Sequence, residues 1–393
     1  MYNLDQIKLV SEVLKKNKTN YWTGENCKKF EDEFSKYHNI KYSIAVSNGS
    51  VALEIALKAL NLKKGDNVIV TPRSFVASAS CVLNVNLKPI FADVDYNGNL
   101  SIDGISKVYN KNVKAIILVH LNGLSCELDP IIKFVKKKKI FLIEDCSQAH
   151  GAKYKGKFVG TFGDVSTWSF CQDKIISTGG EGGMISTNNK KIWKNCWQLK
   201  DHGKNYDKVF NKKHRIGYRW LHDSLGSNYR MTEIQAVIGR YQLSRLEKTL
   251  KKRINIAFKY IKYLKLFFGN DALFQNLNFS CLNCPLQDYK KCNKCRHSFY
   301  RLNLFINSSK IDNISIIKKL TNAGIDCNVG PCPELYLEKV FFNSQYRFKK
   351  DLKNAKLIGK KSISFPINPQ KSTRVVINEI NKITQILKKF FDV

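Results

Sequence analysis

The chain has 393 residues, 43% of them hydrophobic, so it is long enough to bury a large core and to form two domains. No apolar run approaches the roughly 18 residues of a membrane span, and the polar start lacks a signal peptide's apolar region, so we expect a cytoplasmic protein with no membrane partner. The formal net charge of +34 would suit a phosphate-bearing substrate. The lysines are scattered over every segment, as drift in an A/T-rich genome would leave them. We therefore expect no nucleic-acid partner.

The first two thirds of the chain alternate helices with short apolar strands. Residues 1–25 are predicted to form a helix and a lead-in, and residues 26–250 a large domain. Within it, helices are predicted at 51–62, 75–84 and 129–138, and strands at 67–72, 88–94, 113–120 and 140–145. Short continuous apolar strands separated by helices indicate an α/β fold with a mostly parallel sheet covered on both faces. Ligands of such sheets bind beyond the carboxyl ends of the strands.

The pattern changes near residue 250. One or two long helices are expected at 229–266, and residues 251–393 are predicted to form a smaller C-terminal α+β domain. Its expected strands lie at 297–306 and 362–367, and its expected helices at 315–325 and 374–391.

Four of the twelve cysteines form a cysteine-rich loop at 281–295. Cys281, Cys284, Cys292 and Cys295 give the spacing C-x2-C-x7-C-x2-C, which can place four thiolates around a structural zinc ion. The alternative is a cysteine-rich surface loop without metal. No catalytic metal is expected, because four thiolates would close the coordination sphere.

Three segments carry residues suited to binding a ligand. Asn48-Gly49-Ser50 precedes a predicted helix, where backbone N–H groups and a hydroxyl can hold an anion, although an ordinary helix N-cap is the favoured reading of this segment alone. Asp145 ends an apolar strand, with Gln148 three residues later. A buried carboxylate is costly unless it is paired, and a protonated ring nitrogen, a helix N-cap or an ion pair could supply its partner.

The third segment is "SFCQDKIISTGGEGG", which supplies Ser169, Lys174 and a glycine-rich turn. A lysine forms a Schiff base only when its amine is neutral part of the time, and burial beside an apolar or cationic group would lower its pKa enough. A phosphate cradle, a carboxylate and a lysine, in this chain order, match the phosphate, the pyridinium nitrogen and the aldehyde of pyridoxal 5'-phosphate (PLP).

From about Tyr21 onward, the chain resembles the DegT/DnrJ/EryC1/StrS family of PLP-dependent nucleotide-sugar aminotransferases, within fold type I. The resemblance rests on several motifs in order, among them "FEDEFSKYHNIKYSIAVSNGSVALEIALKAL", "PIFADVD", "VHLNG", "IEDCSQAHGAKYKGKFVGTFGDVSTWSF", "DKIISTGGEGGM", "DHGK" and "NYRMTEIQAVIGRYQL".

The resemblance implies a role for each of several residues. Lys174 would be the catalytic Schiff-base lysine and would also move protons. Asp145 would bind the pyridinium nitrogen, and Gln148 the ring's phenolic oxygen. The remaining cofactor contacts would be the phosphate ligands Gly49, Ser50 and Ser169, the ring-stacking Phe75, and Asn228, which would reach the phosphate in the neighbouring subunit of a homodimer with shared active sites. The chain departs from the family pattern in four places: Asn48-Gly49-Ser50 stands where Gly-Thr is usual, Asn122 where an aromatic residue is common, the "PRSF" segment that ends in Phe75 is one residue short, and the cysteine-rich loop is an addition.

The implied reaction moves an amino group from an amino acid, in first place L-glutamate, to a nucleotide-linked keto sugar, most often a 4-keto-6-deoxyhexose, for surface polysaccharide. Alternatives are amination at C3, amination of a cyclitol ketone, and sugar dehydration. The dehydratase branch of this fold replaces the lysine with histidine, so Lys174 argues against it. A further alternative is a basic binding protein without enzymatic activity. Such a protein would tolerate the loss of Lys174 or Asp145, so the presence of both residues argues against it.

Overall fold

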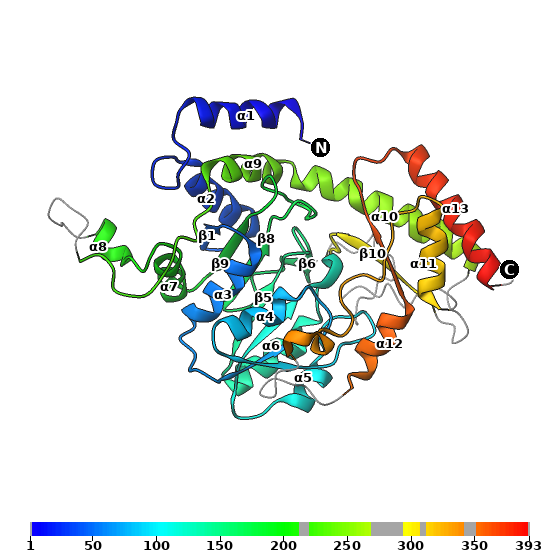
Figure 1. Cartoon of the computed structure of the whole chain (residues 1–393), viewed down its shortest axis with the longest axis horizontal. Coiled ribbons are helices and arrows are strands. Elements are labelled where there is room, and N and C mark those ends of the chain that lie inside the picture. Colours follow the sequence, from blue (N-terminus) through cyan, green and yellow to red (C-terminus); the bar gives the residue numbers. More distant parts are fainter. Residues whose placement is uncertain (1, 212–219, 269–293, 307–311, 342–350, 392–393) are drawn as a thin grey trace.

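The computed structural model describes residues 2–211, 220–268, 294–306, 312–341 and 351–391. A seven-stranded sheet lies at its centre, in the order β1-β9-β8-β5-β4-β2-β3 (Figure 1). The strands are β1 (Tyr42–Val46), β2 (Asn67–Val70), β3 (Lys88–Phe91), β4 (Val113–Val119), β5 (Phe141–Asp145), β8 (Val165–Ser169) and β9 (Gly183–Thr187). Strands β3, β2, β4, β5 and β8 pair in parallel, and β9 runs antiparallel to both of its neighbours. The predicted mostly parallel α/β sheet is therefore confirmed.

Helices cover both faces of this sheet, because side chains along each strand alternate between two cores. In β5, for example, Ile143 enters one core and Leu142 the other. The first core is closed by α3 (Gly49–Ala59), α4 (Ala77–Asn84) and α7 (Lys190–Lys200). The opposite face is covered by α2 (Asn26–His38), α5 (Ile102–Val108), α6 (Leu128–Lys138) and α9 (Glu233–Ser244). A small hairpin, β6 (Lys153–Tyr154) and β7 (Lys157–Phe158), stands apart from the sheet.

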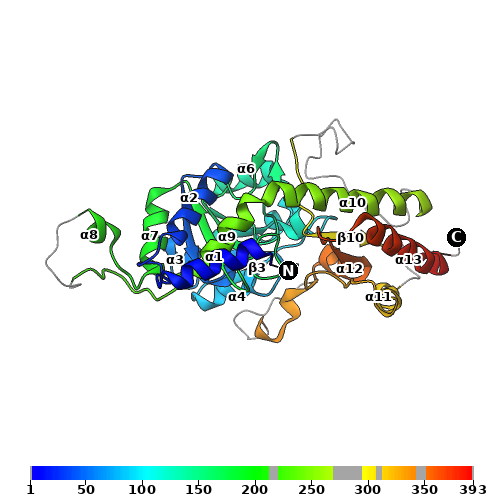
Figure 2. The same cartoon turned by 90° about the horizontal axis from the view of Figure 1, so that it is seen from above.

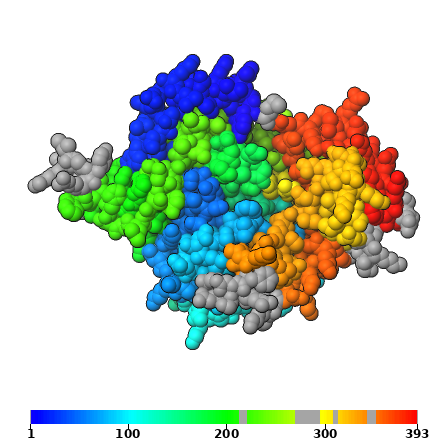
Figure 3. All heavy atoms as spheres, viewed as in Figure 1, coloured from blue at the N-terminus to red at the C-terminus, as the bar shows by residue number. Residues whose placement is uncertain are grey.

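The N-terminal helix α1 (Leu4–Lys15) lies along α9, as Figure 2 shows. Asn3 and Gln6 form a capping box at its start, and Val13 packs with Val237 and Ile238 of α9. The space-filling view places this segment at the upper edge of the molecule and the C-terminal segment at its right (Figure 3). The short helix α8 (Tyr206–Phe210) follows α7.

A further core, apart from the two on the faces of the sheet, forms in the last third of the chain. It joins the long helix α10 (Leu246–Phe268) to the antiparallel pair β10 (Arg301–Phe305) and β11 (Ser362–Pro366), and to α11 (Asn313–Asn322) and α13 (Thr373–Phe391). Two short turns, Leu335–Leu337 and Lys339–Phe341, and helix α12 (Lys353–Lys361) instead supply side chains to the core of the large sheet. The last third of the chain therefore contributes both to its own core and to the core on one face of the large sheet. None of the helices in the described residues is both long and apolar enough to cross a bilayer.

His38, at the end of α2, is expected to make the fold sensitive to acid. Its ring is buried beside Phe34 and Trp168, and burial lowers its pKa to about 3. An unfolded histidine titrates near 6.5, so the stability that neutral His38 contributes is complete above pH 6.5 and is lost as the pH falls toward 3. At pH 5.5 the loss is about 1.4 kcal/mol for this one histidine.

Urea unfolding at pH 7.5 and 5.5 would measure this effect. His38→Gln should lose about 1.4 kcal/mol less stability than the wild type between the two pH values, whereas the exposed His222→Gln should match the wild type. Equal acid losses in all three proteins would contradict a neutral His38 in the folded state.

Candidate active site

The start of α3 lies against the end of β8, at the carboxyl edge of the sheet. The side chain of Asn48 caps α3 by accepting a hydrogen bond from Val51 N at 2.9 Å. A Cβ atom on Gly49 would stand 2.7 Å from Cβ of Ser169, and a Cβ atom on Gly183 would stand 2.4 Å from the Asn48 carbonyl oxygen. The expected N-cap is therefore present, and two glycines allow a helix N-terminus and the Ser169 side chain to approach closely. Ser50, next to Gly49, is exposed.

Asp145, at the end of β5, is a buried carboxylate with no cationic partner among the described residues. Ser78 donates a hydrogen bond to its Oδ2 at 2.9 Å, and Ser147 N donates to Oδ1 at 3.1 Å. Two neutral donors leave the negative charge unneutralised, although a buried charge is normally paired. The carboxylate is therefore suited to a cationic ligand atom.

The adjacent Glu144 has a structural role and is not available to a ligand. Its carboxylate lies near the His120 ring and the Cys146 thiol, a grouping that could in principle hold a metal. However, it accepts hydrogen bonds from the backbone N–H groups of Gly160, Phe162 and Gly163 at 2.6–2.8 Å, and it lies 3.0 Å from His120 Nε2. With both oxygens used in this way, Glu144 fastens the segment between β7 and β8 to the sheet.

Lys174 lies on a loop that is closed by its own backbone. Gln172 N donates to the Gly180 carbonyl at 3.0 Å, and Phe170 N donates to the Gly182 carbonyl at 2.8 Å. Gly179 and Gly180 have φ values of 94° and 137°, which favour glycine. The glycines that follow the lysine thus bend the loop so that it returns to β9.

Two neighbours determine the protonation of the Lys174 amine. Its Nζ lies 3.0 Å from Asp173 Oδ2 and 3.4 Å from Tyr300 OH. Burial acts to lower the pKa of Lys174, but Tyr300 and Asp173 outweigh it, and the pKa is raised. The expectation of a lowered pKa is therefore wrong for the free lysine, because a carboxylate and a phenol accompany the amine into the site.

A cavity of about 730 Å³ collects several of the predicted residues. Lys174, Gln148 and Phe75 line it, together with Asn122 and Tyr300. Gln148 is fixed because its Oε1 accepts a hydrogen bond from Asn122 N at 2.8 Å. The Phe75 side chain is 68% exposed, so one face of its ring is open to a ligand.

Asp145, Gly49, Ser50 and Ser169 do not line this cavity, and neither do Asn228 and Cys295. Asn228 is exposed, and its contacts are with Arg230 and Asp201 rather than with another predicted site residue. Cys281, Cys284 and Cys292 lie outside the described residues. Cys295 is buried, and its Sγ accepts a hydrogen bond from Lys155 N at 3.3 Å. The shared dimer site and the zinc site therefore stay predictions.

The sequence reasoning missed Tyr300, Asp173 and Ser78. Asp173 adjoins the lysine and could have been weighed as its partner. Tyr300 lies 126 residues from Lys174 along the chain and Ser78 lies 67 from Asp145, so no local pattern could have paired them.

These features fit PLP. Asp145 offers an unneutralised buried carboxylate for the ring nitrogen, Lys174 offers an amine for the aldehyde, and the close contact of Gly49 with Ser169 forms a cradle beside a helix N-terminus for the phosphate.

Gly49→Ala is expected to disturb this cradle. The new methyl group would clash with Ser169, which should destabilise the fold by about 1–3 kcal/mol and weaken PLP binding. Thermal unfolding and a PLP titration followed by absorbance would measure the two effects. Ser50→Ala, at an exposed position, should weaken PLP binding without the loss of stability. Unchanged PLP affinity in Gly49→Ala would contradict the assignment of the cradle.

Comparisons with known proteins identify the family of the chain. The model of the DegT/DnrJ/EryC1/StrS aminotransferase family matches residues 3–384. GDP-perosamine synthase of Escherichia coli O157:H7 is 40% identical over 240 residues, which are 61% of this chain and 63% of that protein. The dTDP-3-amino-3,6-dideoxy-alpha-D-galactopyranose transaminase of Aneurinibacillus thermoaerophilus is 34% identical over 248 residues, 62% of this chain and 64% of that protein. Each match spans less than two thirds of the relative's length.

A structural match covers the whole chain. The X-ray structure of an aminotransferase from Psychrobacter cryohalolentis has a TM-score of 0.91 and 38% sequence identity, and the match covers 100% of this chain and 98% of that one. The family, the fold and the cofactor implied by the sequence motifs are thereby confirmed. The chain belongs to the DegT/DnrJ/EryC1/StrS aminotransferase family and is a PLP-dependent aminotransferase of fold type I.

Proposed function

We propose that this aminotransferase moves the amino group of an amino acid, in first place L-glutamate, to a nucleotide-linked keto sugar. A 4-keto-6-deoxyhexose is the acceptor we favour, and surface polysaccharide is the expected destination of the amino sugar. GDP-perosamine synthase, at 40% identity, supports a nucleotide-sugar substrate. The transaminase from Aneurinibacillus, whose product carries its amino group at C3, keeps C3 amination as the second candidate.

The observation that carries this proposal is a cavity that Lys174 lines together with Gln148, which lies three residues beyond Asp145. Asp145 is a buried carboxylate with no cationic partner among the described residues, and Lys174 is a partly buried amine that lines a cavity large enough for a sugar. PLP, when bound, withdraws electrons from the carbon whose proton is moved. A negative Asp145 would keep the ring nitrogen protonated, which is the state that withdraws electrons best.

Lys174 would hold the cofactor and then carry protons. Once its amine is released, Nζ lies within hydrogen-bond reach of the Tyr300 hydroxyl and the Asp173 carboxylate, so it stays within the cavity. Lys174 can then take a proton from one carbon and give it to another, as general acid–base catalysis requires.

The remaining predicted residues would bind the cofactor and orient it. Gln148, fixed by Asn122 N, would donate its side-chain N–H to the phenolic oxygen of the ring. Gly49, Ser50 and Ser169 would hold the phosphate, and Phe75 would cover one face of the ring. Asn228 is exposed, as a residue that serves the partner's site in a homodimer would be.

The first experiment is an ultraviolet–visible spectrum of the purified protein before and after addition of L-glutamate, beside Lys174→Ala. A visible band that shifts with glutamate in the wild type and is absent from the variant would support the cofactor, the lysine and the donor together. Keto sugars carried on GDP, dTDP and UDP would then be tested as acceptors, with C3 and C4 products distinguished by NMR. Absence of a band after PLP is supplied would refute the proposal.

A further inference from the structure

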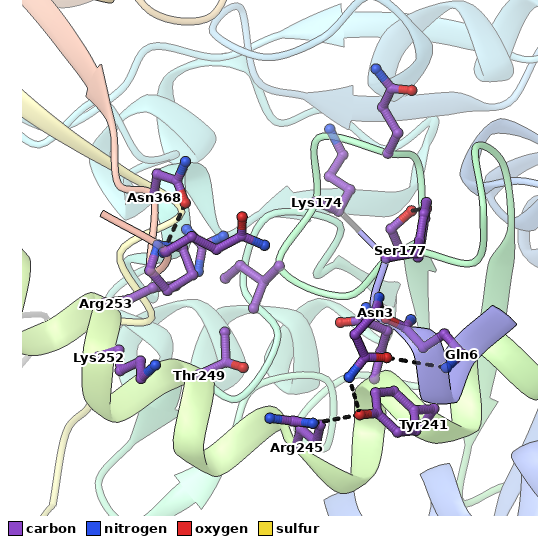
Figure 4. Close-up of a pocket in the computed structure, with 16 residues that line it drawn as sticks. Asn3, Gln6, Lys174, Ser177, Tyr241, Arg245, Thr249, Lys252, Arg253 and Asn368 are labelled. Atoms are coloured by element: carbon purple, nitrogen blue, oxygen red, sulfur yellow. Dashed lines mark hydrogen bonds between the residues drawn. The ribbon is translucent and has the colours of Figure 1, made fainter. Parts of the chain in front are cut away.

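The side chain of Lys174 enters its cavity beside that of Asp173, the residue before it. Lys174 N donates a hydrogen bond to the Cys171 carbonyl at 3.0 Å, which closes a turn that contains Asp173. Both residues line the cavity of about 730 Å³. Figure 4 shows the lysine from the neighbouring cavity, where its side chain points away from Asn3 and Tyr241. The lysine amine is therefore directed toward Asp173 and not toward the N-terminal segment.

The lysine amine, the carboxylate and a phenol form one hydrogen-bonded group. Lys174 Nζ lies 3.0 Å from Asp173 Oδ2 and 3.4 Å from Tyr300 OH. The Tyr300 hydroxyl donates to the same Asp173 oxygen. Tyr300 stands directly before β10, so the carboxylate is held between the lysine loop and the C-terminal part of the chain. The amine is thus held by a carboxylate that is itself fixed.

The charge states within this group follow from its contacts. Burial acts to raise the pKa of Asp173, but the hydrogen bond from Tyr300 and the nearby Lys174 amine outweigh it, and the pKa is lowered. Burial, together with the hydrogen bond to Asp173, raises the pKa of Tyr300. Burial acts to lower the pKa of Lys174, yet its two neighbours raise it. At neutral pH the group therefore holds a carboxylate, an ammonium and a protonated phenol.

Other titratable groups near the amine do not replace this carboxylate. His150 lies close to Lys174, but burial lowers the pKa of its ring to about 3, so it stays neutral. Charged and titratable side chains from other parts of the cavity lining are Arg301, Cys332, Glu338 and Lys339. Among the described residues, Asp173 is the one carboxylate that forms an ion pair with the amine.

We propose that Asp173 is a positioning residue that keeps the Lys174 amine protonated and within the cavity whenever the lysine is not bonded to the cofactor. The proposal rests on the proposed function, in which Lys174 holds the cofactor and then carries protons. A protonated amine can give a proton but cannot bond to an aldehyde, because that bond needs the electron pair of the neutral amine. Asp173 therefore favours the proton-donating form of the free lysine, and Tyr300 supports it by fixing the carboxylate.

Trace acetylation of the full-length protein freed of PLP, read by peptide mass spectrometry, tests the proposal, because only a neutral amine is acetylated. Asp173→Asn keeps the shape of the side chain and removes its charge. At about pH 8 its Lys174 should be acetylated about tenfold faster than in the wild type, since one pKa unit is a tenfold change in neutral amine. Above about pH 11 the two rates should converge. The exposed Lys157 in the same sample serves as the reference for reagent activity.

Tyr300→Phe keeps the carboxylate and removes a hydroxyl that carries no charge at neutral pH. Its increase in acetylation should therefore be smaller than that of Asp173→Asn. Asp207→Asn is the matched control, because Asp207 is 42% exposed, against 47% for Asp173, and lies 2.6 Å from the amine of Lys194. It should leave the acetylation of Lys174 unchanged.

Three results would overturn the proposal: no increase in Asp173→Asn, an equal increase in Tyr300→Phe or in the control, or an increase of the same size at every pH. The last result would mean that the variant opens access to the amine without changing its protonation. Acetylation needs neither cofactor nor turnover, so it is independent of the spectral test with glutamate. If the spectral test fails while the acetylation shift appears, Asp173 still holds the ammonium and the proposed reaction is wrong.

Discussion

Lys174→Ala is expected to reduce aminotransferase activity by about 10³-fold or more, because it removes the amine that binds the cofactor and the group that carries the proton. The loss should lie in kcat and should appear in both half-reactions, with glutamate and with the keto sugar. The visible band of the bound cofactor should also disappear from the spectrum. Single-turnover kinetics of each half-reaction would measure the effect.

The exposed Lys157→Ala, on the small hairpin, is the matched control and should retain the wild-type spectrum and rate. Thermal unfolding of Lys174→Ala should show a folded protein, since the lysine amine makes only two side-chain hydrogen bonds. Full activity in Lys174→Ala would show that another amine performs the reaction.

Asp145→Asn is expected to lower kcat by about 10²–10³-fold, the usual cost of losing one preorganised electrostatic group. The single oxygen of asparagine can still accept the hydrogen bond from Ser147 N, and its amide nitrogen can donate to the Ser78 hydroxyl, which can also accept, so the fold should persist. What disappears is the negative charge, and the ring nitrogen of the cofactor should then lose its proton at a lower pH. A pH titration of the cofactor's absorbance would measure that change directly.

Ser78→Ala removes one hydrogen bond to the same carboxylate but leaves its charge in place. Its activity should fall much less than that of Asp145→Asn, and the absorbance titration should move only slightly. If the two variants lost activity equally, the charge of Asp145 would not be the cause, and the carboxylate would serve only to shape the site.

The sequence by itself determined the layers of the fold. The predicted strand 113–120 forms β4 (Val113–Val119), and the predicted helix 374–391 forms α13 (Thr373–Phe391). Such agreement is expected where apolar side chains repeat at the period of one element, because the period decides which residues face the core. The kinds of side chain in the site could also be predicted from the sequence. The carboxylate at the end of an apolar strand stands in one short segment, and the lysine with its glycine run stands in another.

Only the tertiary structure decided how those segments meet. Strand β9 enters the sheet antiparallel between β1 and β8, and its Gly183 packs on the Asn48 carbonyl, a contact between residues that are distant in sequence. In the same way Tyr300 reaches Lys174 across 126 residues and raises its pKa against the effect of burial. Pairing of this kind depends on packing between elements, which leaves no periodic trace in the sequence.

A cavity of about 590 Å³ between the N-terminal segment and α10 shows the same division. In sequence, Lys252 and Arg253 are two basic residues among many, and Gln6 is one polar residue of an N-terminal helix. Packing of α1 against α9 and the continuation of the chain into α10 bring them to one hollow beside Lys174. Composition set the net charge of the chain, and long-range packing decided which basic side chains lie next to one another, because only the folded chain brings distant residues together.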